Sequence, residues 1–265
     1  MSATGGEQGR QGATGRPRAF VLGGARRVGR AITVELARAG CDVDFSYHTS
    51  EEGAAETVGL LRGYGSDARA WRLSLSDPDA AGVESQKIAA SRVTWDVVVL
   101  CASTYDATPI ERLSAEQLMR AYAVNAASQA VVLGSFVDGL RTSVQRGGGA
   151  VVTMCDVHAM GETGLPRRGM LAYAMSKAAL VEMTLVLAKE LAPSVRVNGV
   201  APGVVAWPES GPDADAAAQA RYLARVPLGR AGTPEEAAGA VRWLALEATY
   251  CTGQVVRLDG GRSLG

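Results

Sequence analysis

The stretch RAFVLGGARRVGRAITVELARAG, residues 18–40, decides the fold class of this chain. It begins as a short apolar run that ends in two glycines, which is typical of a buried strand followed by a tight turn. Apolar residues then recur at helical spacing until Gly40, where the glycine ends the helix. A strand joined to a helix in this way predicts the first unit of an α/β fold.

The same alternation continues along the chain. We expect further strands at residues 41–47, 67–75, 95–102, 147–156, 195–202 and 253–261. We expect helices at residues 50–65, 77–91, 114–144, 171–192 and 233–248, with starts marked by Ser50, Asp77-Pro78, Ser114 and Thr233. Strands that alternate with helices predict an α/β fold, here a single doubly wound domain with a seven-stranded parallel sheet.

Composition sets the limits of this domain and excludes several kinds of partner. Residues 1–17 are rich in Gly, Gln and Arg and predict a disordered tail, followed by one domain at residues 18–265. The 27 basic and 27 acidic residues give no electrostatic case for binding nucleic acid or a membrane surface. No uninterrupted apolar run reaches the ~18 residues of a membrane span, and the four cysteines form no CxxC pair. These features predict a cytoplasmic protein with buried free thiols.

Two irregular stretches follow strands: HAMGETGLPRRGM at residues 158–170 and GVVAWPESGPDADAA at residues 203–217. In open parallel sheets, ligands bind beyond the carboxyl ends of the strands. We therefore expect both stretches to form walls of a pocket for a small-molecule substrate.

Gly23, Gly24 and Gly29 lie at the first strand-to-helix turn, where glycines let the backbone approach a pyrophosphate and a helix N-terminus offers free N–H groups. The second strand ends without the Asp or Glu that would bind a ribose 2′-hydroxyl. Groups suited to a phosphate stand nearby and favour NADPH over NADH: Arg26, Arg27, Tyr47, His48, Thr49 and Ser50. The alternative is that both arginines are solvated and His48 is an ordinary loop residue.

The stretch MLAYAMSKAAL, residues 170–180, places Tyr173 and Lys177 four positions apart on one expected helix, so they share a face. A phenol has a pKa of ~10, and a neighbouring ammonium lowers that pKa by stabilising the phenolate. Tyr173 would then be a usable acid for a carbonyl or imine that receives a hydride. The alternative is a surface lysine beside a half-buried tyrosine.

The segments around this pair resemble the short-chain dehydrogenase/reductase family over residues 18–265. AYAMSKAAL is similar to its Tyr-Lys helix, LAPSVRVNGVAPGVV to the strand that follows, and VPLGRAGTPEEAAGAVRWLALEATYCTGQVVRLDGG to its C-terminal quarter. The resemblance implies a Rossmann-type dinucleotide-binding reductase domain, hydride transfer with NAD(P)(H), and a homotetramer or homodimer. It implies that Asn125 is an active-site asparagine and that Lys177 holds the nicotinamide ribose. Further cofactor contacts are implied at Val28, Ala102, Ser103, Pro202, Gly203 and Val204.

Three departures from the family pattern resemble one branch, the pteridine reductases and dihydromonapterin reductases. Arg27 replaces the middle glycine of the turn motif, LCAS at residues 100–103 replaces the usual NNAG, and Asp156 stands where the family has a serine. The branch has an Asn-Ala-Ser motif followed by an aromatic residue that stacks on the pterin. By that resemblance, substrate contacts are implied at Ser103, Tyr105 and Trp207.

The charge of Asp156 supports a nitrogen-rich substrate independently. A serine hydroxyl can donate to a carbonyl oxygen that becomes an alkoxide, whereas an ionised carboxylate cannot donate and repels that oxygen. Asp156 therefore either stays protonated or faces substrate N–H donors such as those of a pterin. The alternative is that Asp156 caps a turn and the substrate meets Tyr173 alone. Arg167 and Arg168 precede Tyr173 and contact either an acidic substrate or solvent.

We predict an NADPH-dependent oxidoreductase that transfers hydride to a C=N or C=O bond of a small, nitrogen-rich, pterin-like bicyclic substrate. Tyr173 donates the proton, Lys177 lowers its pKa, Asn125 supports the relay, and Asp156 orients or protonates the substrate. No metal is expected in the site. The first alternative is a ketoreductase of natural-product biosynthesis, and the second is a non-catalytic nucleotide sensor.

Overall fold

A computed structural model describes residues 15–160, 165–209 and 212–264. Its seven strands form one sheet in the order β3-β2-β1-β4-β5-β6-β7, and every neighbouring pair is parallel. The strands are β1 Arg18–Leu22, β2 Asp42–Tyr47, β3 Arg69–Arg72, β4 Val97–Leu100, β5 Gly149–Met154, β6 Val195–Pro202 and β7 Val255–Leu258. The predicted α/β fold with a seven-stranded parallel sheet is confirmed.

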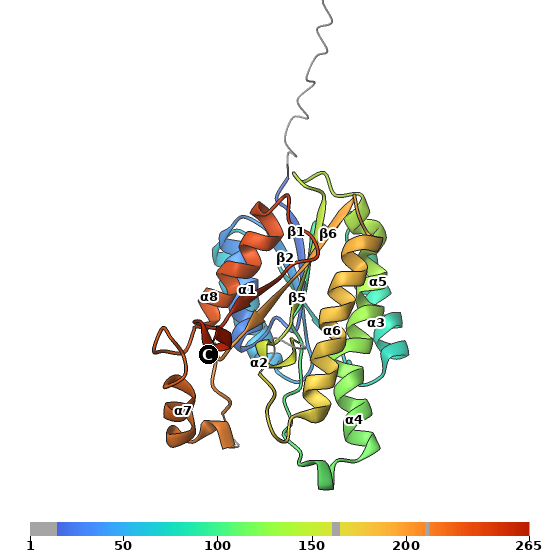
Figure 1. Ribbon diagram of the computed structural model, residues 1–265. Coiled ribbons are helices and arrows are strands. Elements are labelled where there is room, and N and C mark those ends of the chain that lie inside the picture. Colours follow the sequence, from blue (N-terminus) through green and yellow to red (C-terminus); the bar gives the residue numbers. More distant parts are fainter. Residues whose placement is uncertain (1–14, 161–164, 210–211, 265) are drawn as a thin grey trace, which may run out of the picture.

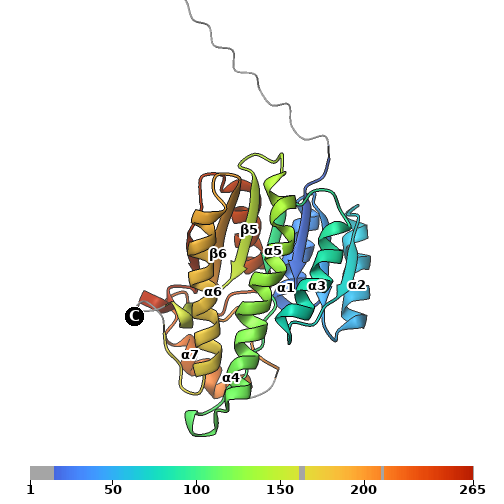
Figure 2. The ribbon, with the colours of Figure 1, turned by 90° about the vertical axis from the view of Figure 1, so that its right-hand side faces the viewer.

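Helices cover both faces of the sheet, with α1, α2 and α8 on one side and α3, α5 and α6 on the other (Figures 1 and 2). A strand that is buried on both faces should be apolar throughout, and β4, with the sequence VVVL, is buried at every position. The helices are α1 Arg27–Arg38, α2 Glu51–Gly63, α3 Pro78–Ala90, α4 Ala115–Tyr122, α5 Ser128–Arg141, α6 Leu171–Glu190, α7 Ala216–Leu223 and α8 Pro234–Arg242.

Three of the four predicted helix caps are present. The side chains of Asp77, Ser114 and Thr233 accept hydrogen bonds from backbone N–H groups in the first turns of α3, α4 and α8. The prediction for Ser50 was wrong, because its side chain makes no capping bond to α2. Its backbone, with φ −88° and ψ 74°, departs from the extended geometry that the three capping residues adopt.

Two helical segments differ from the prediction. The expected helix at residues 114–144 is interrupted by a π turn, Ala123–Ala127, between α4 and α5. The second irregular stretch was expected to run to residue 217, but α7 begins at Ala216 because Asp215 caps it by accepting from the Ala218 N–H at 2.8 Å. The eight residues of α7 are too few to show helical periodicity in the sequence, and only Tyr222 among them is buried.

Residues 1–14 of the predicted tail lie outside the described residues. The last residues assigned to that tail contact the domain. The Arg16 guanidinium forms an ion pair of 3.1 Å with Asp42, and the Pro17 carbonyl accepts a hydrogen bond of 2.8 Å from the Asp42 N–H. These contacts extend the folded domain to Arg16, two residues before the predicted boundary.

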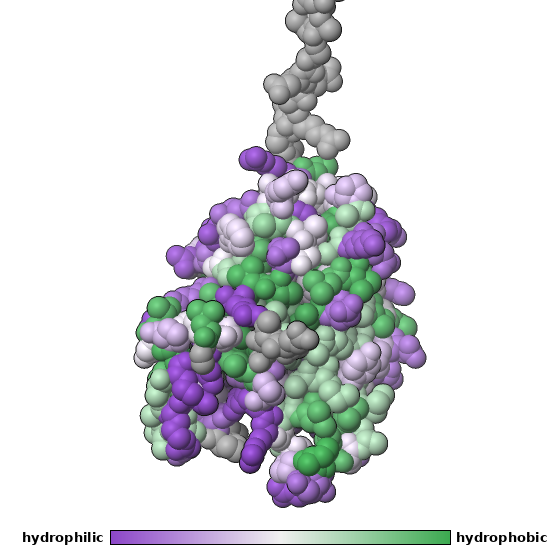
Figure 3. Space-filling model, in the orientation of Figure 1, coloured by the Kyte–Doolittle hydropathy of each residue, from purple (hydrophilic) through white to green (hydrophobic). Residues whose placement is uncertain are grey.

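Helix α6 alone among the described helices is long and apolar enough to cross a membrane by length and composition, with a mean hydropathy of 1.5 over its most apolar window. The prediction from the sequence counted only uninterrupted apolar runs. It did not identify α6 as long and apolar enough, because Ser176 and Lys177 interrupt its apolar residues. One face of α6 packs on the sheet, and the opposite face exposes a second apolar stripe made of Leu171, Met175, Leu185 and Val186. Figure 3 shows apolar surface on the side where α4 and α6 lie.

Candidate active site

Tyr173 and Lys177 both lie on the buried face of α6, next to the carboxyl end of β5. Their relative exposures are 8% and 3%, which excludes the alternative of a surface lysine beside a half-buried tyrosine. The Lys177 ammonium donates a hydrogen bond of 2.7 Å to the Met154 carbonyl at the end of β5 and lies 5.9 Å from the centre of the Tyr173 ring. A buried phenol and a buried amine therefore meet at the edge where ligands of parallel sheets bind.

Asp156, two residues beyond β5, joins this pair. The Tyr173 hydroxyl donates to its Oδ2 atom at 2.6 Å. Its Oδ1 atom accepts from the His158 backbone N–H at 2.7 Å and lies 2.8 Å from His158 Nδ1. Asp156 thus caps the 3₁₀ turn Val157–Ala159, as the alternative interpretation expected, and contacts Tyr173 at the same time.

Hydrogen bonding decides the charge of Asp156. Burial alone would raise the pKa of this carboxyl, but the hydrogen bonds and charge of His158, with the bond from Tyr173, lower it below its ordinary value. Of the two states considered from the sequence, the structure favours the ionised one. An ionised carboxylate only accepts hydrogen bonds, so His158 Nδ1 carries a hydrogen in this contact.

The expected lowering of the Tyr173 pKa by Lys177 stays a prediction, and other features of the site act on that pKa in the opposite direction. Burial raises the pKa of Tyr173 well above 10, and the negative charge of Asp156 and the hydrogen bond to it raise it further. Burial also lowers the pKa of Lys177, which weakens its ability to stabilise a phenolate. Sequence spacing places the ammonium near the phenol, but burial and the Asp156 carboxylate, a group from another element, both raise the pKa of the phenol.

Asn125 lies in the π turn between α4 and α5 and is fully buried. Its side-chain oxygen accepts from the Thr104 N–H at 2.8 Å, and its side-chain nitrogen donates to the Thr104 carbonyl at 3.1 Å and to Ser176 Oγ at 3.0 Å. Ser176 in turn donates to the Tyr173 carbonyl at 2.7 Å. Asn125 therefore ties the segment after β4 to the helix that carries Tyr173.

Three loops meet over Tyr173. The Tyr105 ring, from the segment after β4, packs edge-to-face on the Tyr173 ring with centres 4.9 Å apart. The Arg167 guanidinium contacts the Tyr105 hydroxyl. It also donates hydrogen bonds of 2.5 and 2.6 Å to the two carboxylate oxygens of Asp213. A small hollow beside them is lined by Tyr105, His158, Arg167, Met170, Tyr173 and Ala174. The first irregular stretch thus forms a wall of this hollow, although residues 161–164 lie outside the described residues.

The first glycine turn fits the pyrophosphate of a dinucleotide. A Cβ atom on Gly29 would lie 1.9 Å from the Gly23 carbonyl oxygen, so only glycine allows α1 to start this close to β1. Helix α1 has no side-chain cap and no acidic residue in its first turn. Its N-terminal N–H groups are therefore available to an anion at the carboxyl edge of the sheet.

Arg26 and Arg27 face a different loop from the one predicted. Arg26 pairs with Glu209 at 3.2 Å, and Arg27 donates to the Ala206 and Trp207 carbonyls at 3.2 and 2.7 Å. Both arginines thus contact the segment after β6, and neither contacts residues 47–50 after β2. Arg27 has φ 50°, a left-handed conformation that favours glycine, at the position where the family motif has its middle glycine.

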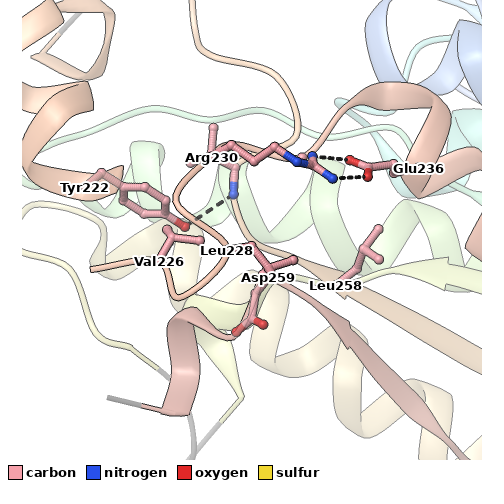
Figure 4. Close-up of a pocket in the computed structure, with 10 residues that line it drawn as sticks. Tyr222, Val226, Leu228, Arg230, Glu236, Leu258 and Asp259 are labelled. Atoms are coloured by element: carbon pink, nitrogen blue, oxygen red, sulfur yellow. Dashed lines mark hydrogen bonds and ion pairs between the residues drawn. The ribbon is translucent and has the colours of Figure 1, made fainter. Parts of the chain in front are cut away.

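Other predicted residues lie around this region rather than in the hollow. Ser103 Oγ donates to the neighbouring Thr104 carbonyl, and the Trp207 ring packs edge-to-face on Tyr222 with centres 5.6 Å apart. The Val204 N–H donates to the Tyr222 hydroxyl at 3.3 Å. Figure 4 shows this contact at one side of a second hollow, with the Arg230–Glu236 ion pair at another side.

Sequence reasoning missed two groups of the site, His158 and Asp213. Both were inside the irregular stretches that were expected to form pocket walls, and a histidine two residues after a functional aspartate was the available signal. Nothing in the sequence pairs Arg167 with Asp213, because the two residues are 46 positions apart and come from different loops.

Comparisons with known proteins agree with this geometry. A family model described as enoyl-(acyl carrier protein) reductase matches residues 23–263. A short-chain dehydrogenase/reductase from Serratia marcescens superposes with a TM-score of 0.83 at 32% identity, covering 93% of this chain and 98% of that one. This chain belongs to the short-chain dehydrogenase/reductase family.

Curated members of the family are similar over nearly the whole chain. A 3beta-hydroxysteroid dehydrogenase of Eggerthella lenta is 31% identical over 92% of this chain and 92% of its own length. A 3-oxoacyl-[acyl-carrier-protein] reductase of Aquifex aeolicus is 31% identical over 91% of this chain and 95% of its own length. The short-chain dehydrogenase/reductase fold and an oxidoreductase activity are therefore shown for this chain.

Proposed function

We propose that the protein is an NADPH-dependent reductase of a C=N or C=O bond in a small, nitrogen-rich, pterin-like bicyclic compound. The observation that carries this proposal is the Asp156 carboxyl, whose Oδ2 atom lies 2.6 Å from the Tyr173 hydroxyl and whose pKa is lowered by its bonds to His158 and Tyr173. A carboxylate attracts the N–H groups of an amidine-containing heterocycle and repels the oxyanion of an ordinary ketone.

The residues at the carboxyl edge of the sheet fit a dinucleotide. The glycine turn and the start of α1 would hold the pyrophosphate, and residues 47–50 include no acid that would repel a 2′-phosphate. Bound NADPH would supply the hydride. The exposed guanidiniums of Arg26 and Arg27 add positive charge at the start of the same helix and support NADPH over NADH.

Within the chain, Tyr173 would transfer its hydroxyl proton to the reduced atom of the substrate. Lys177 and Asn125 would hold the helix and the cofactor side of the site in place, since their side chains are buried and bonded to the ends of β4 and β5. Tyr105 would lie over the substrate ring, and Asp156 would orient the ring through its N–H donors.

A ketoreductase is the second candidate, and the comparisons favour it. The relatives include a 3beta-hydroxysteroid dehydrogenase, 3-oxoacyl-[acyl-carrier-protein] reductases and a cyclohexanol dehydrogenase of Rhodococcus, which are named for ketones or alcohols. A ketone substrate would develop negative charge on its oxygen beside Asp156. That charge needs compensation from a neighbouring group.

Oxidation of NADPH with dihydrobiopterin, dihydromonapterin and a panel of cyclic ketones separates these candidates. Turnover of a dihydropterin without turnover of the ketones supports the first proposal, and the reverse pattern supports the ketoreductase. NADPH binding without oxidation in any reaction would leave only a nucleotide sensor.

We also propose a cytoplasmic homotetramer, with a homodimer as the alternative. The exposed apolar side chains of α6 named above would be buried in a subunit contact, beside the exposed Glu182 of the same face. Four free cysteines suit a reducing compartment.

A further inference from the structure

The proposed reaction leaves a charge problem at Tyr173. When the hydroxyl gives up its proton, a phenolate forms at a place that already holds the Asp156 carboxylate 2.6 Å away. Two negative charges this close in a buried site repel each other strongly. A reductase that uses this contact needs a positive charge near Asp156, on the side of the carboxylate that faces away from Tyr173.

His158 occupies that far side. Its Nδ1 atom lies 2.8 Å from Oδ1 of Asp156, and its side chain is 11% exposed. Its backbone N–H bonds the same oxygen, which fixes the carboxylate so that Oδ2 faces Tyr173. The His158 side chain lines the hollow with Tyr173, so the imidazole lies beside the place where substrate would bind.

We propose that His158 is a positioning residue that compensates the charge of Asp156 during proton transfer from Tyr173. With His158 protonated, the His158–Asp156 pair carries no net charge, and loss of the Tyr173 proton creates a single negative charge. With His158 neutral, the same step creates a second negative charge beside the first. The inference rests on the proposed reductase function, and it makes reduction faster at pH values where the imidazole is protonated.

Other ionisable groups surround the pair but suit this role less well. Tyr105 lies in the segment after β4, Arg167 in the loop before α6, and Tyr173 and Lys177 on α6. Asp213 lies in the loop before α7, and Tyr222 on α7. Burial raises the pKa of all three tyrosines, and Arg167 is engaged by Asp213. Imidazole is the group that ordinarily changes charge between pH 5 and 8. Lys177, whose pKa is lowered by burial, is the competitor that the experiment must separate.

The test compares kcat from pH 5.5 to 8.5 for the unchanged enzyme and for His158→Asn. The asparagine amide nitrogen takes the place of Nδ1 and keeps a donor to Asp156, but it cannot become charged. We expect kcat of the unchanged enzyme to fall about tenfold as pH rises through this range. We expect His158→Asn to have a flat profile at the lower rate, with KM for substrate changed less than twofold.

A matched control changes an exposed charged residue on the helix that carries Tyr173. Lys189→Gln must keep the fall of kcat with rising pH, because Lys189 is exposed at the other end of α6. If kcat of His158→Asn still falls with rising pH, the titrating group is Lys177 or another residue, and the inference is overturned. A flat profile in the unchanged enzyme would also overturn it.

A second measurement needs no turnover and separates this inference from the proposed function. Urea unfolding of the unchanged protein, His158→Asn, Asp156→Asn and the double variant gives the coupling between the two side chains. We expect the coupling to be larger at pH 5.5 than at pH 8.5, because only the protonated imidazole pairs with the carboxylate as an ion. Equal coupling at both pH values would overturn the charge pairing even if the protein proves to be a reductase. Pairing without any NADPH oxidation would instead contradict the proposed function.

Discussion

The Tyr173 hydroxyl donates a hydrogen bond of 2.6 Å to Asp156, so the predicted proton donor of this site is engaged by an acceptor from the neighbouring strand end. This contact raises the pKa of Tyr173, together with burial, and lowers the pKa of Asp156. The pair must therefore be understood as a unit. Each group shifts the pKa of the other, in addition to the effects of burial on Tyr173 and of His158 on Asp156.

Replacing Tyr173 with phenylalanine removes the proton donor and keeps the ring. We expect turnover to fall ~10²–10⁴-fold, the usual contribution of a general acid, with NADPH affinity changed little. Tyr250→Phe is the matched control, because Tyr250 is fully exposed and should tolerate the change. Steady-state kinetics and a fluorescence titration with NADPH make the comparison. Near-normal turnover of Tyr173→Phe would remove Tyr173 from the mechanism.

Replacing Asp156 with asparagine should lower the pKa of Tyr173. The negative charge of Asp156 and its hydrogen bond both favour the protonated phenol, so a neutral amide makes ionisation easier. NMR titration with ¹³C-labelled tyrosine follows this one ring among the seven, with Tyr173→Phe to assign its signal. An unchanged Tyr173 titration would show that burial alone raises its pKa.

The same position distinguishes the two candidate substrates. If the substrate is pterin-like, Asp156→Asn and Asp156→Ser should both reduce kcat/KM, because each loses the negative charge that attracts the ring N–H groups. If the substrate is an ordinary ketone, Asp156→Ser should match the unchanged enzyme, since a neutral donor stabilises a developing oxyanion. The measurement is kcat/KM for the three proteins on the best substrate found.

The cofactor prediction is a preference for NADPH of at least tenfold in kcat/KM, which corresponds to ~1.4 kcal/mol. Arg27→Gly should reduce this preference by weakening NADPH while leaving NADH nearly unchanged. Glycine is the right replacement because φ 50° at this position strains any other side chain. Glu209→Gln is the matched variant. It removes the anion that now pairs with Arg26 and Arg27, so NADPH affinity should rise. Equal use of both cofactors by the unchanged enzyme would contradict the prediction.

The Arg167–Asp213 ion pair should stabilise the fold in a pH-dependent way. Burial alone would raise the pKa of Asp213, but hydrogen bonds from Arg167 lower it. A carboxyl with a lowered folded pKa contributes stability above its unfolded pKa and loses it as pH falls through the folded value. We expect Asp213→Asn to cost about 1 kcal/mol at pH 7 and less at pH 3.

Urea unfolding at both pH values checks this prediction for the unchanged protein and for Asp213→Asn. Asp215→Asn, two residues away, is the control, because Asp215 caps α7 without an ion pair. An equal cost of Asp213→Asn at pH 3 and pH 7 would mean that the contact stabilises by shape rather than by charge.

Local patterns in the sequence determined the fold. Residues 18–40 contain a strand, a glycine turn and a helix, and repeats of that alternation predicted the parallel sheet because apolar periodicity is a property of neighbouring residues. Capping at Ser114 and Thr233 was predicted for the same reason. Helix α7 was not, because one buried tyrosine in eight residues gives no period.

The sequence by itself also brought Tyr173 and Lys177 to one face of a helix, since that needs only a spacing of four. The tertiary structure decided what surrounds them. Sheet order sets Asp156 and His158, from the end of β5, against Tyr173, and packs Tyr105, Arg167 and Asp213 from three loops above it. A pKa depends on charges and burial in space, so the upward shift of the Tyr173 pKa by burial and by Asp156 could be found only when distant segments were placed together.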